Sequence, residues 1–441
     1  MTHYDVVIVG ASFAGLTLAH HLPTSLRVLV VDVKPEAGST VESTGLITTK
    51  TYNAFKRFFD IDSCITNQIS SICVVSPTYD DFFVSTVDAP WIYQTDTKAL
   101  VKALADTVPP NVEVRMKTVF QDMHQDTQTR LTIQTRGQAR EVIEARVVVG
   151  ADGSHSRVAQ AAGLDRNTRF LFGYEQVFFG HVHLGPHPEE TIYHYWFGEF
   201  SLGYGGWLSP TIVDGRPAFR IGLAKREKDR GEARALLTAF VHQLVERGDI
   251  RMDGEIDRPG YTFGSLIPIG GVLKKIHRGN VLLVGDAAGF CGAFAADGIK
   301  GSVLSATEGA LLIERYINGD EGAFTELKKH MNAHGGLIEY YRRQQRYRWI
   351  WDQMRRNRTF KAMYDIIKAE QDTFLSQFCD SKDKHRSLAW TVLKFRHAQK
   401  LIRYSLCILS DMIFSKGTFI QIILAGSSPK TFLKKVTNVR R

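Results

Sequence analysis

The sequence predicts an α/β fold with three parts: a parallel-sheet domain, an antiparallel sheet inserted into it, and a helical C-terminal extension. Strand-like apolar runs lead into glycine turns at three well-separated places, and alternating apolar and polar residues fill the stretch between the second and third turns. Basic residues, interleaved with aromatic ones, are concentrated near the end of the chain. With 441 residues, 44% of them hydrophobic, the chain can form two or three domains around a substantial core.

The first glycine turn lies inside a strand, helix, strand unit. Residues 4–10 and 27–32 are nearly continuous apolar runs, typical of parallel strands that are covered on both faces. Leucines with helical spacing follow the turn over residues 16–22. A unit of this order and length is the dinucleotide-binding half of a Rossmann-like domain.

Three residues of this unit have the types that dinucleotide binding requires, and a fourth departs from the usual pattern. Gly10 permits the tight turn, and Gly15 allows the helix and the strand to pack closely. Ser12 replaces the middle glycine of the usual fingerprint, so a side chain accompanies the backbone that approaches the phosphates. Asp32 ends the second strand, at the spacing of an acid that binds a ribose hydroxyl. The helix after the turn directs unpaired N–H groups at a pyrophosphate.

The other two glycine turns repeat the pattern. Residues 144–150 lead into a turn with Asp152 and Gly153, and residues 280–285 lead into a turn with Asp286. Taken singly, each turn also fits an aspartate that caps the start of a helix. The series of three favours one long dinucleotide that lies along a single fold.

In this order, the three turns resemble those of the FAD-dependent geranylgeranyl reductase family within the flavoprotein hydroxylase (p-hydroxybenzoate hydroxylase-like) superfamily, over residues 4–320. The resemblance implies FAD as cofactor, with Asp152 and Gly153 beside its pyrophosphate and Asp286 at the ribityl chain or the pyrophosphate. It also implies that Gln94 lies near FAD, at the start of a helix. The predicted cofactor-binding residues are Gly10, Ser12, Phe13, Ala14, Gly15, Asp32, Val33, Thr44, Gln94, Asp152, Gly153, Gly285, Asp286, Gly298 and Ile299.

Two segments are predicted beside the flavin ring. Residues 38–46 occupy the place where many of the reductases have a Cys-x-Gly element, and here Ser43 and Thr44 bring hydroxyls instead. These hydroxyls either hydrogen-bond the flavin or form a turn. Gly298 begins a predicted helix over residues 299–315, whose N-terminal N–H groups would stabilise negative charge on a reduced flavin.

An antiparallel sheet of about four strands is predicted between the second and third turns. Alternating segments, separated by glycine, proline and aspartate, cover residues 176–184, 190–197, 202–210 and 217–224. The sheet either forms one wall of a substrate pocket or uses its aromatic side chains only to fill its own core. The predicted domains are an FAD-binding domain at residues 1–165 and 262–320, a substrate domain at 166–261, and a basic helical region at 321–441.

The reaction is predicted from two partial resemblances to the reductases. Residues 203–210 and 219–224 resemble an aromatic-Gly-x-Trp-x-Phe-Pro strand and the glycine-containing strand after it, with Ser209 in place of phenylalanine. Residues 289–299 resemble Gly-Phe-x-x-Pro-x-x-Gly-Glu-Gly-Ile, with Asp297 in place of glutamate. The resemblance implies reduction of double bonds in an isoprenoid or another long apolar substrate. The candidate catalytic residues are Tyr204, Trp207 and Cys291.

Two other functions fit the same residues. A hydroxylase or halogenase that acts on an aromatic group would also use FAD and the aromatic sheet, although the sequence lacks the His-x-x-Pro-Pro and Trp-x-Trp-x-Ile-Pro signatures. A non-catalytic prenyl or protein carrier is the third reading. Cys291 is either a proton donor or a small buried apolar side chain. The expected electron donor is NADPH or a reduced electron-transfer protein, because no second dinucleotide fingerprint is visible.

Charge is unevenly distributed along the chain. Residues 315–441 contain 25 basic and 11 acidic residues, against 30 and 35 in the rest of the chain. This basic region would suit an anionic membrane surface or an acidic protein partner, or it forms a solvated helical face. We expect no nucleic-acid partner, because no nucleic-acid-reading module accompanies the charge.

The patterns of cysteine, histidine and hydropathy bear on metal binding, thiol state and cellular location. The five cysteines lack metal-ligand spacing and the histidines are scattered, so we expect reduced thiols, no metal and a cytoplasmic location. Apolar stretches at residues 401–414 and 418–426 are too short and too interrupted by charge to span a bilayer. They are expected to lie at the surface or pack on the body, and peripheral membrane attachment is the alternative to a purely cytoplasmic location.

Overall fold

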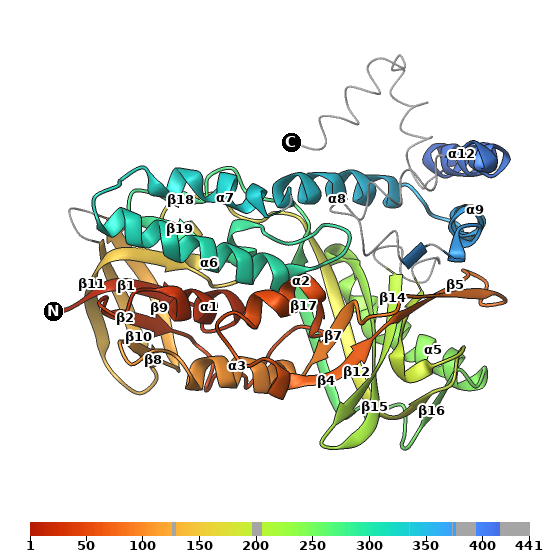
Figure 1. Cartoon of the computed structure of the whole chain (residues 1–441), viewed down its shortest axis with the longest axis horizontal. Coiled ribbons are helices and arrows are strands. Elements are labelled where there is room, and N and C mark those ends of the chain that lie inside the picture. The colour runs from red at the N-terminus through yellow and green to blue at the C-terminus, as the bar shows by residue number, and fades with distance from the viewer. Residues whose placement is uncertain (126–128, 196–204, 335, 373, 376–393, 415–441) are drawn as a thin grey trace, which may run out of the picture.

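Two large β-sheets lie beside each other and organise the chain (Figure 1). The computed structural model describes residues 1–125, 129–195, 205–334, 336–372, 374–375 and 394–414, and the structural statements below refer to these residues. In Figure 1 the first sheet and its helices occupy the left of the molecule, and the second sheet occupies the right.

The first sheet has five parallel strands at its centre. Across the sheet these are β19 (Val281–Leu283), β11 (Arg140–Gly150), β1 (Thr2–Val9), β2 (Val28–Val31) and β8 (Val112–Arg115). All four residues of β2 are buried, as expected for a parallel strand that is covered on both faces. Antiparallel strands extend the sheet: β9 (Thr118–Gln125), β10 (Thr129–Thr135) and β18 (His277–Arg278).

Helices bury the apolar faces of this sheet. The helices α1 (Phe13–His21) and α6 (Gly298–Ile317) pack against each other, and they share one hydrophobic core with the strands. They confirm the helices predicted after the first and third glycine turns. The other helices of this part are α2 (Thr49–Phe55), α3 (Thr97–Asp106) and α4 (Arg157–Ala161).

The second sheet is larger than predicted. It has eight strands in place of about four: β5 (Ser71–Val75), β6 (Phe82–Thr86), β12 (Phe170–Val182), β13 (Thr191–Tyr195), β14 (Gly205–Val213), β15 (Arg216–Arg226), β16 (Ile250–Met252) and β17 (Tyr261–Pro268). The segment before residue 165 supplies β5, which pairs in parallel with β13. The predicted boundary at residue 166 therefore does not separate the two sheets. One side of the sheet packs on α5 (Ala233–Glu246).

A small third sheet corrects the predicted position of Gln94. It contains β3 (Leu46–Thr48), β7 (Ile92–Thr95) and β4 (Ile65–Ile69). Gln94 lies in β7 and does not start a helix. The helix α3 begins after Asp96, whose carboxylate accepts hydrogen bonds from two backbone N–H groups of its first turn and so fixes the helix start.

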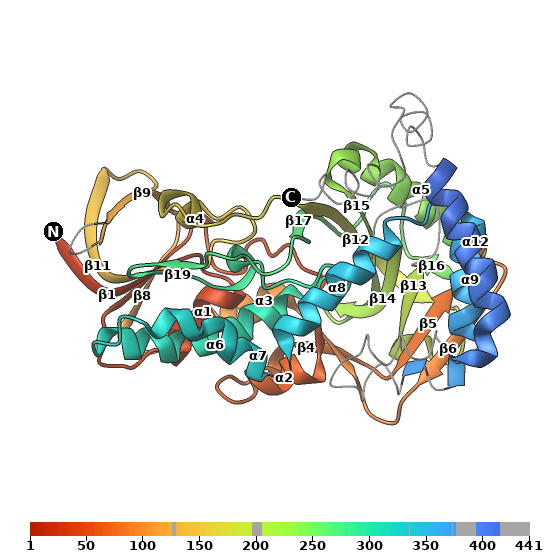
Figure 2. The same cartoon turned by 90° about the horizontal axis from the view of Figure 1, so that it is seen from above.

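The C-terminal helices belong partly to the body of the protein. They are α7 (Leu327–Ala333), α8 (Leu337–Trp351), α9 (Asn357–Lys368) and α12 (Ala398–Phe414). Tyr340 and Tyr341 of α8 lie in the core of the first sheet. Arg348 is 1% exposed, and its guanidinium donates a hydrogen bond to the carboxylate of Asp352. The basic stretch predicted as a solvated face or docking surface is therefore in part a buried helix. Figure 2 shows α9 and α12 beside β5 and β6, at the end of the molecule far from β1.

The predicted surface helix near the C-terminus is confirmed in α12, whereas residues 418–426 lie outside the described residues. Among the described residues, no helix has the length and apolar character needed to cross a membrane.

Candidate active site

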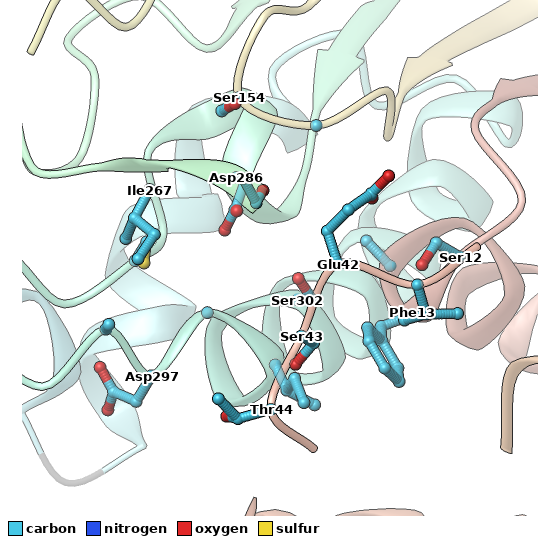
Figure 3. A pocket seen from close by; sticks show the side chains of 18 of the residues that line it. Ser12, Phe13, Glu42, Ser43, Thr44, Ser154, Ile267, Asp286, Asp297 and Ser302 are labelled. Carbon is cyan, nitrogen blue, oxygen red and sulfur yellow. The ribbon is translucent and has the colours of Figure 1, made fainter. Parts of the chain in front are cut away.

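The three glycine turns meet at one edge of the first sheet. Because β1, β2, β11 and β19 are parallel, their carboxyl ends lie together, and Gly10, Asp32, Asp152 and Asp286 follow these ends. A cavity of about 820 Å³ opens at this edge, and all four of these residues line it. Figure 3 shows Ser12 just before α1, Phe13 at the start of α1, Glu42 to Thr44 from the loop after β2, and Asp286 and Asp297 around this cavity.

Close backbone contacts explain the glycines of the first turn. Gly10 has φ +113°, and a Cβ atom there would lie 2.3 Å from the carbonyl oxygen of Ala151. At Gly15 a Cβ atom would lie 1.9 Å from the carbonyl oxygen of Gly10. A side chain at Gly10 would push the first turn away from the second turn. A side chain at Gly15 would push the helix away from the end of its own strand. These contacts bring the N-terminus of α1 to the cavity.

Asp152 caps the start of a helix and also lines the cavity. One carboxylate oxygen accepts hydrogen bonds from the backbone N–H groups of Arg157 (2.7 Å) and Val158 (3.1 Å), at the start of α4. The other oxygen, Oδ1, is buried and has no hydrogen-bond partner among the described residues. Burial raises the pKa of Asp152. The aspartate thus caps a helix and also leaves one acceptor for a ligand in the cavity.

Asp286 also presents a buried oxygen acceptor to the cavity. Its Oδ1 atom is buried without a hydrogen-bond partner among the described residues, and its side chain lines the cavity. Burial, and to a smaller extent the nearby Asp297, raise the pKa of Asp286 to about 6. A buried acceptor of this kind is costly unless a donor reaches it, so the site fits a ligand that carries hydroxyl groups.

Asp32 is held in place by backbone groups. Its two carboxylate oxygens accept hydrogen bonds from Ala11 N–H (2.7 Å) and Lys34 N–H (2.8 Å). Each carboxylate oxygen can accept a second hydrogen bond, so the side chain is oriented but not saturated. Its place at the end of β2 matches the expected site of a ribose.

A group of ionisable side chains stands at the N-terminus of α6. Asp297 accepts a hydrogen bond from the Tyr340 hydroxyl at 3.0 Å and forms an ion pair with Lys300. The Lys300 ammonium also lies over the Tyr340 ring, 4.1 Å from its centroid. All three residues line the cavity. Sequence patterns did not indicate Lys300 or Tyr340, because Tyr340 lies on α8, far along the chain.

The other end of the cavity is mainly apolar. Trp91, Ile192, Trp207 and Phe294 line it together with His194, the cross-strand neighbour of Trp207. Burial lowers the pKa of His194 to about 3, so this imidazole is neutral near pH 7. The cavity therefore joins a polar end, suited to a dinucleotide, to an apolar end suited to a hydrocarbon.

Most of the predicted site residues line this one cavity. They are Gly10, Ser12, Phe13, Ala14, Asp32, Val33, Thr44, Asp152, Gly153, Trp207, Asp286, Cys291, Gly298 and Ile299. Gly15 and Gly285 lie behind the lining and hold its turns in place. Gln94 also lies outside the lining, fully buried near Ser209. Tyr204 lies outside the described residues.

Cys291 faces the cavity as a thiol of low acidity. It is buried, and burial, together with the charges of Asp286 and Asp297, raises its pKa well above the usual range. Such a thiol carries little thiolate at neutral pH and is a poor nucleophile. The four cysteines among the described residues are all free thiols.

Comparison with known proteins identifies the cofactor of this protein. The family described as an FAD binding domain matches residues 76–323, which is more than half of the chain. The chain belongs to this family. The protein therefore binds FAD and is an FAD-dependent oxidoreductase. The acceptors on Asp152 and Asp286 and the glycine turns at the carboxyl edge of the sheet fit this cofactor.

Relatives of this flavoprotein include reductases of lipids. It is 27% identical to digeranylgeranylglycerophospholipid reductase 1 of Methanothermobacter thermautotrophicus, over 69% of this chain and 76% of the relative. A geranylgeranyl bacteriochlorophyll reductase-like protein from Thermoplasma acidophilum has a similar fold, with a TM-score of 0.74 at 17% identity, over 91% of this chain and 99% of that one. A flavin-dependent brominase also shares the fold, with a TM-score of 0.63 at 13% identity, over 93% and 100% of the two chains.

Proposed function

We propose that this flavoprotein reduces carbon–carbon double bonds of an isoprenoid lipid. The observation that carries the proposal is the continuity of the cavity, which joins the dinucleotide-binding turns to an apolar wall of aromatic and aliphatic side chains. A cofactor at the first end and a hydrocarbon chain at the second would share one water-poor space. The lipid reductases among the relatives support this substrate class.

Each part of the cavity has a task in this proposal. Asp32, Asp152 and Asp286, with the N-termini of α1 and α6, hold the cofactor through hydroxyl and phosphate groups. Reduced FAD, once bound, supplies the hydride for the double bond. Trp207 and Phe294 enclose the hydrocarbon and exclude water from it. The electron donor is NADPH or a reduced electron-transfer protein that docks transiently.

An anaerobic comparison of lipids tests the proposal. The FAD-loaded protein, reduced with dithionite, is incubated with an extract rich in polyprenyl lipids, and the extract is compared by mass before and after. We expect species heavier by two hydrogen atoms per saturated double bond, because hydride and proton add across the bond. An FAD-free preparation is the control. Unchanged lipids, together with oxygen-dependent hydroxylation or halogenation of an aromatic compound, would favour the alternative oxygen chemistry. A protein that cannot retain FAD would favour a carrier.

We further propose that the protein works at an anionic membrane surface through α12. The inner face of α12 packs on α9 through Leu401, Tyr404 and Ile408. On the opposite face Ile402 and Leu406 are 62% and 64% exposed. Leu409 continues this strip, and Arg403, whose side chain is 64% exposed although it lies 3.8 Å from Asp365 of α9, borders it. A helix that is apolar outward and carries a basic residue beside its apolar strip suits a lipid surface with anionic head groups.

Vesicle flotation tests this surface. The double variant I402E/L406E should bind at least about tenfold less to vesicles of three parts phosphatidylcholine and one part phosphatidylglycerol, because each charge must enter the interface. Removal of the entire C-terminal region is unsuitable, since Tyr341 of α8 is part of the core. The matched control is I212E/L311E, at two residues that are each 51% exposed elsewhere. Equal flotation of the two double variants would contradict the proposal.

A further inference from the structure

A buried charged pair lies inside the second sheet, just outside the cavity. Glu175 on β12 is fully buried, Arg220 on β15 is 8% exposed, and their side chains are 3.2 Å apart. Neither residue lines the cavity. Burial raises the pKa of Glu175, while Arg220 acts in the opposite direction. Removing two charges from water is costly, so a buried pair of this kind is weak evidence for a role in stability alone.

Glu175 connects this pair to the cavity wall. Its second carboxylate oxygen accepts a hydrogen bond of 2.7 Å from the indole nitrogen of Trp207 on β14. Trp207 is the member of this group that lines the apolar end of the cavity. The carboxylate therefore holds one edge of the ring that the proposed substrate would contact.

Sheet register explains how the two side chains meet across an intervening strand. Gly222 on β15 is the direct neighbour of Glu175 on one side and of Trp207 on the other. A Cβ atom at Gly222 would lie 2.4 Å from the indole ring. Because glycine has no side chain, the ring can lie over the strand and reach Glu175. The absence of a side chain at Gly222 thus permits the hydrogen bond between Trp207 and Glu175.

The same group reaches the small third sheet. When the side-chain amide of Gln94 on β7 is turned so that its oxygen faces Arg220, the oxygen accepts a hydrogen bond from Arg220 Nε at 3.1 Å and the nitrogen donates to the carbonyl oxygen of Pro210; this is the orientation that satisfies both amide atoms. Arg220 is thereby held from two sides, by Gln94 and by Glu175. The network links β7 of the third sheet to the tryptophan at the apolar end of the cavity.

We propose that Glu175 is a positioning residue that fixes the Trp207 ring as a rigid wall of the substrate end, and that this ring orientation determines which hydrocarbon chains fit. This inference rests on the function proposed above, from which the substrate class is taken. The orientation of the ring itself does not depend on that function. Fixing a large aromatic side chain in advance reduces the ordering cost when a flexible chain binds.

A double-mutant cycle with a spectroscopic readout tests this inference. The variants are Glu175→Gln, Trp207→Phe and the pair, prepared with FAD and labelled with 5-fluorotryptophan. In ¹⁹F spectra, Glu175→Gln should shift or broaden the one resonance that Trp207→Phe removes. With a polyprenyl lipid, Glu175→Gln should lower kcat/KM about tenfold alone and have no further effect in the Trp207→Phe background.

Several outcomes would overturn the inference. An unchanged Trp207 resonance in Glu175→Gln would do so, and so would equal losses of kcat/KM in the two backgrounds, which indicate a general structural effect. If Glu175→Gln does not fold, Gly222→Ala provides the second variant, because its methyl group should displace the same ring and resonance. Failure of the proposed function would appear as no lipid reduction in any variant, whereas the ¹⁹F result would still test the ring position.

Discussion

Replacing Gly301 with alanine is expected to abolish FAD binding and to lower the melting temperature by several degrees. Gly301 lies in the first turns of α6, where a Cβ atom would be 1.8 Å from the carbonyl oxygen of Phe290. The backbone on both sides of this contact is rigid, so the helix must move away from the third glycine turn. Overpacking of this kind costs about 1–3 kcal/mol, more than the gain in helix propensity of about 1 kcal/mol. The displacement would also move Asp286 and the helix N-terminus away from the cofactor.

The same helix provides a matched control. Gly309 lies two turns further along α6, where a Cβ atom would be 3.3 Å from a side-chain methyl of Val284. Gly309→Ala should therefore retain FAD and change stability by less than about 1 kcal/mol, because a side chain can adjust. Thermal unfolding and FAD titration of both variants test the account. Normal FAD affinity in Gly301→Ala would contradict the idea that the docking of α6 forms the site.

Replacing Asp286 with asparagine is expected to stabilise the FAD-free protein and to weaken FAD binding. The pKa of Asp286 is raised to about 6 in the folded state, against an ordinary value of 3.8. A group with a raised folded pKa contributes stability at low pH that is lost as the pH rises through about 6. At neutral pH the ionised carboxylate therefore destabilises the FAD-free protein by up to about 3 kcal/mol, and asparagine removes this cost. FAD loses a charged acceptor for its hydroxyl groups.

Two measurements separate these effects. Melting of the FAD-free proteins should show Asp286→Asn above wild type at pH 7, with a difference that shrinks towards about pH 4. FAD titration should show an affinity at least about tenfold lower for Asp286→Asn, since bonds to charged groups contribute roughly 1.5–3 kcal/mol. Asp32→Asn is a useful comparison because backbone N–H groups already engage both of its oxygens. Identical melting curves at both pH values, or unchanged FAD affinity in Asp286→Asn, would contradict this role.

Local sequence patterns were sufficient to predict the individual strands and helices around the glycine turns. The buried strands, the helix after Gly10 and the long helix after Gly298 follow from apolar periodicity and glycine positions. The second sheet was underestimated because β5 pairs with β13, more than one hundred residues away in the chain, and β6 then pairs with β5. Such long-range pairing depends on tertiary packing, which short sequence windows do not contain.

The residues of the candidate site divide in the same way, into those that local patterns indicate and those that long-range packing brings together. Asp152 and Asp286 could be predicted because each follows a buried strand and a glycine turn. Tyr340 could not, because its basic surroundings resemble a solvated helix, whereas packing on α6 brings it to Asp297. Gln94 was expected at a helix start, but it lies in β7, which pairs with β3 and β4. The links between domains were thus the part that sequence patterns did not reveal.

Transfer of electrons from the bound flavin to a carbon–carbon double bond is the step on which the proposed function depends. A single-turnover experiment without oxygen tests this step: the reduced holoprotein is mixed with a purified polyprenyl lipid while flavin absorbance is followed. We expect the oxidised flavin spectrum to return, with one double bond saturated for each flavin reoxidised. A flavin that stays reduced until oxygen is admitted, with the lipid unchanged, would rule out this reaction.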